Sequence, residues 1–313
     1  MRVATIDIGT NSVLLLVAES EGGALRPLRE RATVTRLGEG VDRNRRLLDA
    51  ACERTLACLS DYAAQLRELS VARLDAVGTS AMRDAEGGQE FVARAARILG
   101  IPPRVIDGNE EARLTFAGAL SGLSVPPEPG KVTVFDIGGG STEIVVGSLT
   151  ASARQLVAAV SLNIGSVRLF ERHVRSDPPT ADEMQRVERD IALALVDAPK
   201  PEADATLVGV AGTVTQLAAL ELELIRYDAT RVHGYRLTCQ AVDRLATRLA
   251  SLDLAARRSL PGMEPARADV LVVGSAIARA VLHWSGAAEL VVSDRGVRWG
   301  LAEELAADRG GAS

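Results

Sequence analysis

Short apolar runs alternate with longer amphipathic segments along most of the chain. Between residues 47 and 69 the apolar side chains recur every three or four positions, which predicts a helix with one buried face. The shorter runs are rich in β-branched residues and predict strands. We expect strands at residues 3–6, 13–17, 74–77, 132–135, 143–146, 156–161, 205–210 and 290–292, and further helices at 86–99, 110–120, 216–224 and 297–305. Strands that alternate with helices in this way indicate the α/β class.

Two stretches add to this outline. Residues 268–273 are almost wholly apolar and are predicted as another strand, followed by an alanine-rich helix to residue 282. Residues 125–130, Val-Pro-Pro-Glu-Pro-Gly, combine three prolines with a glycine and predict a linker. A boundary between two domains is expected there.

Residues 132–146, Val-Thr-Val-Phe-Asp-Ile-Gly-Gly-Gly-Ser-Thr-Glu-Ile-Val-Val, place a glycine turn between two strands. A dinucleotide fingerprint or a P-loop would place a helix after the glycines, so neither motif is present. Successive amide groups in such a turn can point into one concavity that binds anions. Asp136 stands at its edge, where a carboxylate can hold a hydrated divalent cation. The turn predicts a phosphate site made of Gly138, Gly139, Gly140, Ser141 and Thr142.

The start of the chain repeats this design. Asp7-Ile-Gly-Thr-Asn-Ser12 also lies between two predicted strands. Either copy alone could be an ordinary hairpin turn, but two copies of one design indicate two related domains that face a cleft. The second set of predicted phosphate-binding residues is Gly9, Thr10, Asn11 and Ser12, with Asp7 as a metal ligand.

Two further features allow both a functional and a structural interpretation. Gly212 and Thr213 end a third glycine turn that precedes a helix, so they could bind phosphate at its N-terminus or could form a tight packing turn. Glu110 and Glu111 fall in the first turn of a helix, with Asn109 as the expected N-cap. Acidic residues there complement the helix dipole, which is a sufficient structural reason for both.

Charge and composition narrow the classes of ligand. A formal net charge of -5 and an aromatic content of 3% argue against a nucleic-acid partner. No apolar run approaches the length of a membrane span. The first residues lead directly into a strand rather than a signal peptide, so we expect a cytoplasmic protein without a membrane partner.

Cysteine and histidine positions suggest no soft metal site. Cys52, Cys58 and Cys239 include no Cys-x-x-Cys pair, which disfavours structural zinc and a disulfide framework. Cys52 and Cys58 fit the apolar face of a helix and are predicted core residues. His173 and His283 stand in no ligand spacing and are predicted to be structural.

Together these motifs resemble those of the Ppx/GppA family, the exopolyphosphatases and guanosine pentaphosphate phosphohydrolases, in its short two-domain form. The resemblance implies the actin/Hsp70/sugar-kinase fold, with two ribonuclease-H-like domains around a central cleft. We expect the domains at 1–125 and 126–296, with a last helix at 297–313 that packs back on the first. The motifs are Asp7-Ile-Gly-Thr-Asn-Ser12, Gly78-Thr-Ser-Ala-Met-Arg83, Gly108-Asn-Glu-Glu-Ala-Arg113, Asp136-Ile-Gly-Gly-Gly-Ser-Thr-Glu143, Gly209-Val-Ala-Gly-Thr213, His233-Gly234 and Pro265-Ala-Arg-Ala-Asp269.

The resemblance also implies roles for individual residues. Glu111, directly before Ala-Arg, corresponds to a carboxylate base, and Arg83 corresponds to an arginine that holds phosphate. Asp136 corresponds to the acidic residue of the second phosphate loop, and Glu143 to an acidic residue that helps to hold the metal.

The resulting hypothesis is a metal-dependent exopolyphosphatase that removes the terminal phosphoryl group of inorganic polyphosphate. The predicted catalytic residues are Glu111 and Asp136. Mg²⁺ (or Mn²⁺) near Asp7, Asp136 and Glu143 would neutralise charge, and Glu111 would orient and deprotonate the attacking water. A guanosine pentaphosphate phosphohydrolase and a kinase are alternatives, and a non-catalytic phosphate or nucleotide sensor would need the glycine loops but not Glu111. Long family members carry extra helical domains after the last motif, so we expect a preference for short polyphosphate. A homodimer is the expected assembly.

Overall fold

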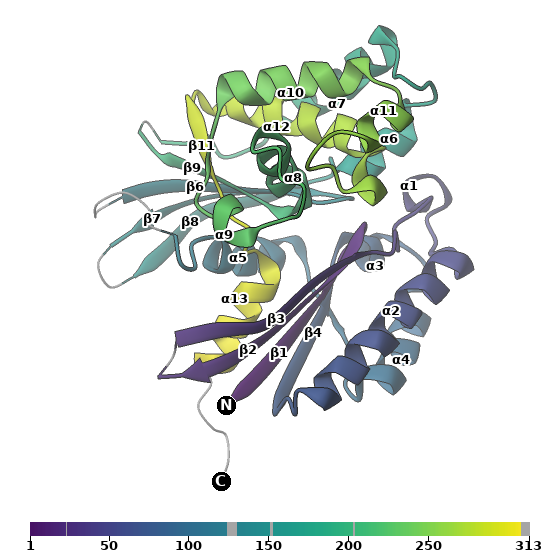
Figure 1. The fold of residues 1–313 in the computed structure, drawn as a ribbon, viewed down its shortest axis with the longest axis vertical. Helices are drawn as coiled ribbons and strands as arrows, with labels where there is room; N and C mark the ends of the chain where they lie inside the picture. Colours follow the sequence, from purple (N-terminus) through teal and green to yellow (C-terminus); the bar gives the residue numbers. More distant parts are fainter. Residues whose placement is uncertain (23, 124–129, 151–152, 203, 308–313) are drawn as a thin grey trace. The chain divides into compact units, whose positions relative to one another are not determined.

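The computed structural model describes residues 1–22, 24–123, 130–150, 153–202 and 204–307. The chain divides into two compact units. The first domain is Met1–Gly118 together with the stretch from Val297, and the second domain is Ala119–Gly296. Each is built on one mixed β-sheet covered by helices (Figure 1). The predicted linker at 125–130 lies outside the described residues, apart from Gly130.

The sheet of the first domain has the strand order β3-β2-β1-β4-β5. The first three strands form an antiparallel meander, whereas β4 and β5 continue parallel to β1. The strands are β1 (Arg2–Ile8), β2 (Ser12–Glu21), β3 (Ala24–Val34), β4 (Arg73–Gly78) and β5 (Arg104–Val105). The helices are α1 (Val41–Asn44), α2 (Asp49–Glu68), α3 (Ser80–Asp84), α4 (Gly88–Leu99), α5 (Gly108–Ala119) and α13 (Val297–Ala307).

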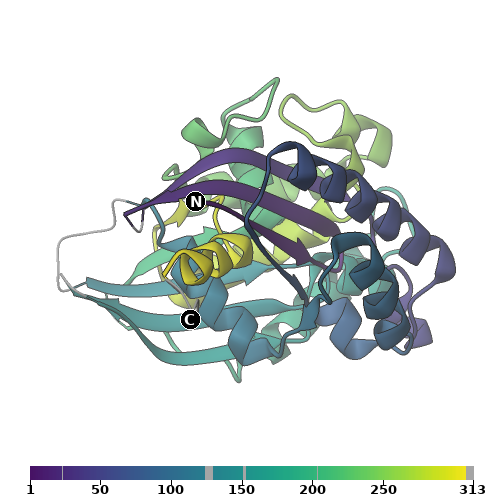
Figure 2. The same cartoon turned by 90° about the horizontal axis from the view of Figure 1, so that it is seen from below.

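Alternation along β1 gives this sheet two buried faces, because successive side chains of a strand point to opposite sides. Ile6 and Ile8 pack in a core cluster with residues of α2 and α4, including Cys52 and Cys58 as predicted. Val3 packs on the other face, in a cluster with Trp299 of α13. The strands β1–β3 and the helix α13 therefore lie side by side in both views (Figures 1 and 2).

The second domain repeats the topology of the first. Its strand order β8-β7-β6-β9-β11 matches β3-β2-β1-β4-β5, again with an antiparallel meander followed by two parallel strands. β10 adds an antiparallel edge strand. This repeat defines the two-domain actin/Hsp70/sugar-kinase fold. The strands are β6 (Gly130–Ile137), β7 (Thr142–Leu149), β8 (Arg154–Leu162), β9 (Thr206–Val210), β10 (Arg236–Thr238) and β11 (Glu289–Val292).

Helices cover this second sheet. The principal ones are α6 (Ser166–His173), α7 (Ala181–Leu195), α8 (Ala211–Glu221), α10 (Cys239–Ser251) and α12 (Leu271–Ser285), and the short ones are α9 (Ala229–Val232), α11 (Leu254–Arg258) and a 3-10 turn at Pro265–Arg267. Across the part of the chain that the structure describes, no helix combines the length and the apolar character needed to cross a membrane.

The strand predicted at residues 268–273 is wrong. The helix α12 begins at Leu271, and its residues 271–278 are all buried. The cause is its position, because α12 packs against α6, α7, α8 and α10 and presents apolar side chains in several directions. An apolar run of this length does not distinguish a buried strand from a buried helix.

Candidate active site

The glycine loop of the first domain leaves amide groups free. Gly9 closes the turn by donating its backbone N–H to the carbonyl of Ser12 at 3.0 Å. The carbonyls of Thr10 and Asn11 accept backbone hydrogen bonds from the segment after β3. Within the described residues the amides of Thr10 and Asn11 donate to no backbone carbonyl, and Thr10 Oγ1 and Asn11 Oδ1 are buried without a hydrogen-bond partner. Free donors in one turn form a concavity for an anion.

The loop of the second domain has the same backbone hydrogen-bond pattern. Gly138 donates its N–H to the carbonyl of Ser141 at 3.0 Å, as Gly9 does to Ser12. The carbonyls of Gly138 and Gly139 accept amide hydrogen bonds from the start of α6, whereas the amides of Gly139 and Gly140 donate to no backbone carbonyl among the described residues. Because the carbonyls are used inside the fold, the amides are left for a ligand.

Arg168 and Gly165, which are not among the residues predicted from the sequence, hold this second loop. Arg168 of α6 is buried and donates from Nε to the carbonyl of Gly140 at 2.6 Å. A Cβ atom on Gly165 would lie 2.4 Å from the carbonyl oxygen of Gly139, so only glycine lets α6 approach the loop. Thr142 was predicted to bind phosphate. It is fully buried, and its hydroxyl donates to the carbonyl of Ile164 at 2.6 Å, so this proton is used inside the fold.

Asp7 is a buried carboxylate near the end of β1. Its Oδ1 has no hydrogen-bond partner among the described residues. Burial and, to a smaller extent, the nearby charge of Glu111 raise the pKa of Asp7 from 3.8 to about 7, against the opposing charge of Arg298. A divalent cation bound here would offset the cost of the buried charge and the repulsion between the two carboxylates.

Glu111 and Arg83 form an ion pair in the first domain. Arg83 of α3 donates from Nη1 to Glu111 Oε2 at 3.0 Å and from the same nitrogen to the carbonyl of Ile106 at 3.0 Å. The motif of Arg83 implied a role in phosphate binding alone, but Arg83 also contacts Glu111, the predicted base. The pair fixes the orientation of the Glu111 carboxylate.

The two glutamates of this helix have different surroundings. The side chain of Glu111 is 9% exposed, whereas that of Glu110 is 31% exposed and bonds to Arg104 at 2.7 Å. The N-cap predicted at Asn109 is wrong, because Asp107 Oδ1 accepts the amide hydrogen bonds of residues 109 and 110. Since Asp107 already caps the helix, the burial of Glu111 is not explained by capping.

Two carboxylates are neighbours in the second domain. Asp136 of β6 pairs with Glu143 of β7 across the antiparallel ladder, which places their side chains on the same face of the sheet. Glu143 is buried and accepts a hydrogen bond from Ser161 Oγ at 2.7 Å, while Asp136 is half-buried. Two adjacent carboxylates with hard oxygen atoms suit Mg²⁺ or Mn²⁺.

The third glycine turn is closely packed. A Cβ atom on Gly212 would lie 2.2 Å from Arg267 Nη1, and one on Gly274 would lie 2.7 Å from Thr213 Oγ1. The helix predicted from residue 216 begins earlier, because α8 starts at Ala211 directly after β9, so Gly212 and Thr213 lie in its first turn and are closely packed there. The guanidinium of Arg267 also brings a positive charge to this helix N-terminus.

Comparison with known protein families identifies the chain as a phosphatase. The model of the Ppx/GppA phosphatase family matches residues 16–308. The chain therefore belongs to the Ppx/GppA phosphatase family, as its motifs predicted.

Individual relatives match almost end to end. The chain is 38% identical to exopolyphosphatase 2 of Mycobacterium tuberculosis, over 97% of this chain and 98% of that protein. The crystal structure of an exopolyphosphatase-like protein superposes with a TM-score of 0.91 at 35% identity, covering 98% of this chain and 99% of that one. A Ppx-GppA enzyme of Aquifex aeolicus gives a TM-score of 0.80 at 34% identity, covering 97% and 99%.

Proposed function

We propose that the chain is an exopolyphosphatase, which hydrolyses the terminal phosphoanhydride bond of inorganic polyphosphate. The observation that supports this most is the environment of Glu111, a buried carboxylate oriented by Arg83 and close to a second carboxylate, Asp7. A sensor would need the glycine loops but no such base. The relatives named exopolyphosphatases favour polyphosphate over guanosine pentaphosphate as the substrate.

Backbone amides are the proposed phosphate ligands. The free amides of Thr10 and Asn11 in the first domain, and of Gly139 and Gly140 in the second, would donate to phosphate oxygens. Such local donors are needed because the chain as a whole carries a net charge of -5. Donors fixed by the fold need no reorganisation as charge develops on the transferred phosphoryl group.

Glu111 is the proposed general base. Its carboxylate would take the proton of the water that attacks the terminal phosphorus, while Arg83 keeps the carboxylate in position. The leaving group is the shortened polyphosphate chain, and the new P–O bond forms as the bridging P–O bond breaks.

The carboxylates fit a divalent cation. Asp7 offers a buried oxygen that no other described residue hydrogen-bonds, and Asp136 and Glu143 offer a neighbouring pair in the second domain. When bound, Mg²⁺ or Mn²⁺ would neutralise charge on phosphate oxygens. A homodimer and a cytoplasmic location stay predictions.

Removal of divalent cations should abolish phosphate release. The candidate ligands are carboxylate oxygens, so Mg²⁺ or Mn²⁺ should restore the activity after chelation. The measurement is phosphate release from polyphosphate after dialysis against a chelator, with each metal added back. Full turnover in excess chelator would contradict the metal assignment.

One assay tests the proposed function directly. Phosphate release is measured side by side on short polyphosphate, long polyphosphate, guanosine pentaphosphate and a nucleoside triphosphate. We expect the highest kcat/KM on a polyphosphate. A higher kcat/KM on guanosine pentaphosphate would identify that compound as the substrate. Binding of polyphosphate without hydrolysis would indicate a sensor.

Replacing Arg83 by Ala should lower kcat as well as raise KM. A residue that only held phosphate would change KM most, but Arg83 also orients Glu111, so the chemical step should slow. Steady-state kinetics of Arg83→Ala and Arg83→Lys measure the two effects, and the lysine variant should recover part of kcat. An unchanged kcat in Arg83→Ala would show that the ion pair has no part in catalysis.

A further inference from the structure

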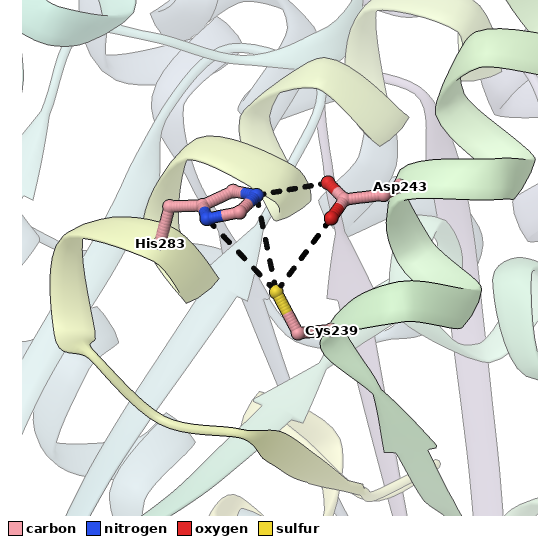
Figure 3. A group of neighbouring side chains, drawn as sticks. All are labelled: Cys239, Asp243 and His283. Carbon is pink, nitrogen blue, oxygen red and sulfur yellow. Dashed lines mark hydrogen bonds and ion pairs between the residues drawn. The ribbon is translucent and has the colours of Figure 1, made fainter.

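Three side chains with metal-binding atoms meet in the second domain, in a cluster that the proposed reaction does not use (Figure 3). Cys239 is the first residue of α10, Asp243 lies one turn later, and His283 lies in the last turn of α12. Figure 3 shows the three side chains pointing toward one another from the two helices.

The distances in this cluster suit a small metal ion. Cys239 Sγ lies 3.8 Å from Asp243 Oδ2 and 3.8 Å from His283 Nε2, and Nε2 lies 2.8 Å from Asp243 Oδ1. Around tetrahedral zinc, with bonds of about 2.0–2.3 Å, neighbouring ligand atoms are about 3.3–3.6 Å apart. The sulfur faces Oδ2 and the imidazole faces Oδ1, so shifts of roughly half an ångström together with a rotation of the carboxylate would bring Sγ, Nε2 and one carboxylate oxygen to bonding distance of one ion.

We propose that Cys239, Asp243 and His283 bind one Zn²⁺ ion, with water in the fourth position. A sulfur, an imidazole nitrogen and one carboxylate form a donor set that favours zinc over Mg²⁺, which takes oxygen ligands. Zn²⁺ displaces the thiol proton of Cys239, which leaves to solvent as the Zn–S bond forms. This site thus differs in chemistry from the oxygen-only ligands proposed for Mg²⁺ or Mn²⁺, which are Asp7 in the first domain and Asp136 and Glu143 in the second.

The backbone holds the ligands in place without metal. The Cys239 amide donates to the carbonyl of Ala288 at 2.8 Å, and Thr238 caps α10 through the amide of Ala241 at 3.2 Å. Cys239 and Asp243 share one face of α10 because they are four residues apart. Burial raises the pKa of the Cys239 thiol, and the charge of Asp243 raises it further, so the thiol stays protonated until a cation binds.

The position of the cluster fits a structural role and easy entry of the ion. α10 and α12 pack against each other in the core of the second domain, so a shared ion would join two helices that already touch. The side chain of His283 is 56% exposed, which leaves a route from solvent. The competing interpretation is a surface ion pair between His283 and Asp243, in which Cys239 has no role.

The second domain contains a matched control for that interpretation. His173 Nε2 lies 2.8 Å from Asp190 Oδ2, the same distance as in the His283–Asp243 pair, and Arg172 rather than a cysteine is the further partner of Asp190. A His–Asp pair alone should not bind zinc tightly, because two ligands give too few bonds. His173→Gln should therefore leave metal binding unchanged.

Co²⁺ is the probe, because it takes zinc's place in tetrahedral sites and gives a thiolate-to-metal charge-transfer band. The full-length chain is freed of metal, returned to excess Mg²⁺ and titrated with Co²⁺ under reducing conditions, then with Zn²⁺. Cys52 and Cys58 are buried, so a thiolate band reports on Cys239. We expect one Co²⁺ per chain with this band, displaced by Zn²⁺, in the wild type and in His173→Gln.

Cys239→Ser should lose the charge-transfer band, and His283→Gln should weaken Co²⁺ binding at least about tenfold. Zn²⁺ should also raise the melting temperature of the wild type and not that of Cys239→Ser, which separates lost binding from misfolding. Absence of the band in a folded wild-type protein, or an unchanged band in Cys239→Ser, would overturn the proposal.

Discussion

Replacing Glu111 by Gln is expected to lower kcat by about 10²–10⁴-fold, the contribution of a positioned general base. Glutamine keeps the shape of the side chain and an oxygen that can accept from Arg83 Nη1, but it cannot take a proton from water. The glycine loops and the other carboxylates are unaltered. Polyphosphate affinity and the melting temperature should therefore change little.

Glu110→Gln is the control for this substitution. The two glutamates share one helical turn and one charge, but Glu110 bonds to Arg104 in a partly exposed ion pair. Its loss should cost no more than about 1 kcal/mol of stability and leave kcat nearly unchanged. The measurements are kcat, melting temperature and polyphosphate affinity for both variants. Equal kcat values would show that the base is another residue.

Sequence patterns were sufficient for the features that depend on local chain geometry. The two Asp-Ile-Gly turns give the same closing hydrogen bond, from Gly9 to Ser12 and from Gly138 to Ser141. Such a turn is specified by a few adjacent residues and by the strands on each side. The helix predicted at 47–69 is α2, because its apolar face alone reaches the core.

Features that depend on packing between distant segments could not be predicted in this way. The apolar start of α12 gave no periodic signal, because the helix is buried on several sides. The pairing of Arg83 with Glu111 joins residues that are 28 positions apart, and Cys239 meets His283 across 44 positions. Spacing along the chain contains no information about such contacts until the fold is known.

Asp7→Asn is expected to lower kcat strongly and to make the metal-free protein more stable. Asp7 is buried next to the charge of Glu111, and within the described part of the chain its Oδ1 has no hydrogen-bond partner. Asparagine has nearly the same shape and no charge, so it removes both the desolvation cost and the repulsion. Loss of a residue that only hydrogen-bonds a metal ligand already lowers metal affinity or activity about 10–100-fold. Loss of a ligand itself should therefore reduce kcat by at least about 100-fold.

The gain in stability should depend on pH in a defined direction. The pKa of Asp7 is raised from 3.8 to about 7 in the folded protein. Folding therefore takes up a proton between about pH 4 and pH 7, so the wild type loses stability as the pH rises through this range. The cost of the charge is complete above pH 7. At about 1.4 kcal/mol per pKa unit it amounts to at most about 4 kcal/mol.

Denaturant unfolding measures this difference in stability. Wild type and Asp7→Asn are compared at pH 5 and pH 8, with and without Mg²⁺. Without metal, the variant should exceed the wild type at pH 8 and approach it as the pH falls toward 4. Mg²⁺ should stabilise the wild type at pH 8 and have a smaller effect on the variant, because a bound cation offsets the charge that Asn lacks. A variant less stable than the wild type at pH 8 without metal would mean that the Asp7 carboxylate is held by the fold itself, and the cation would then have to be sought at Asp136 and Glu143 alone.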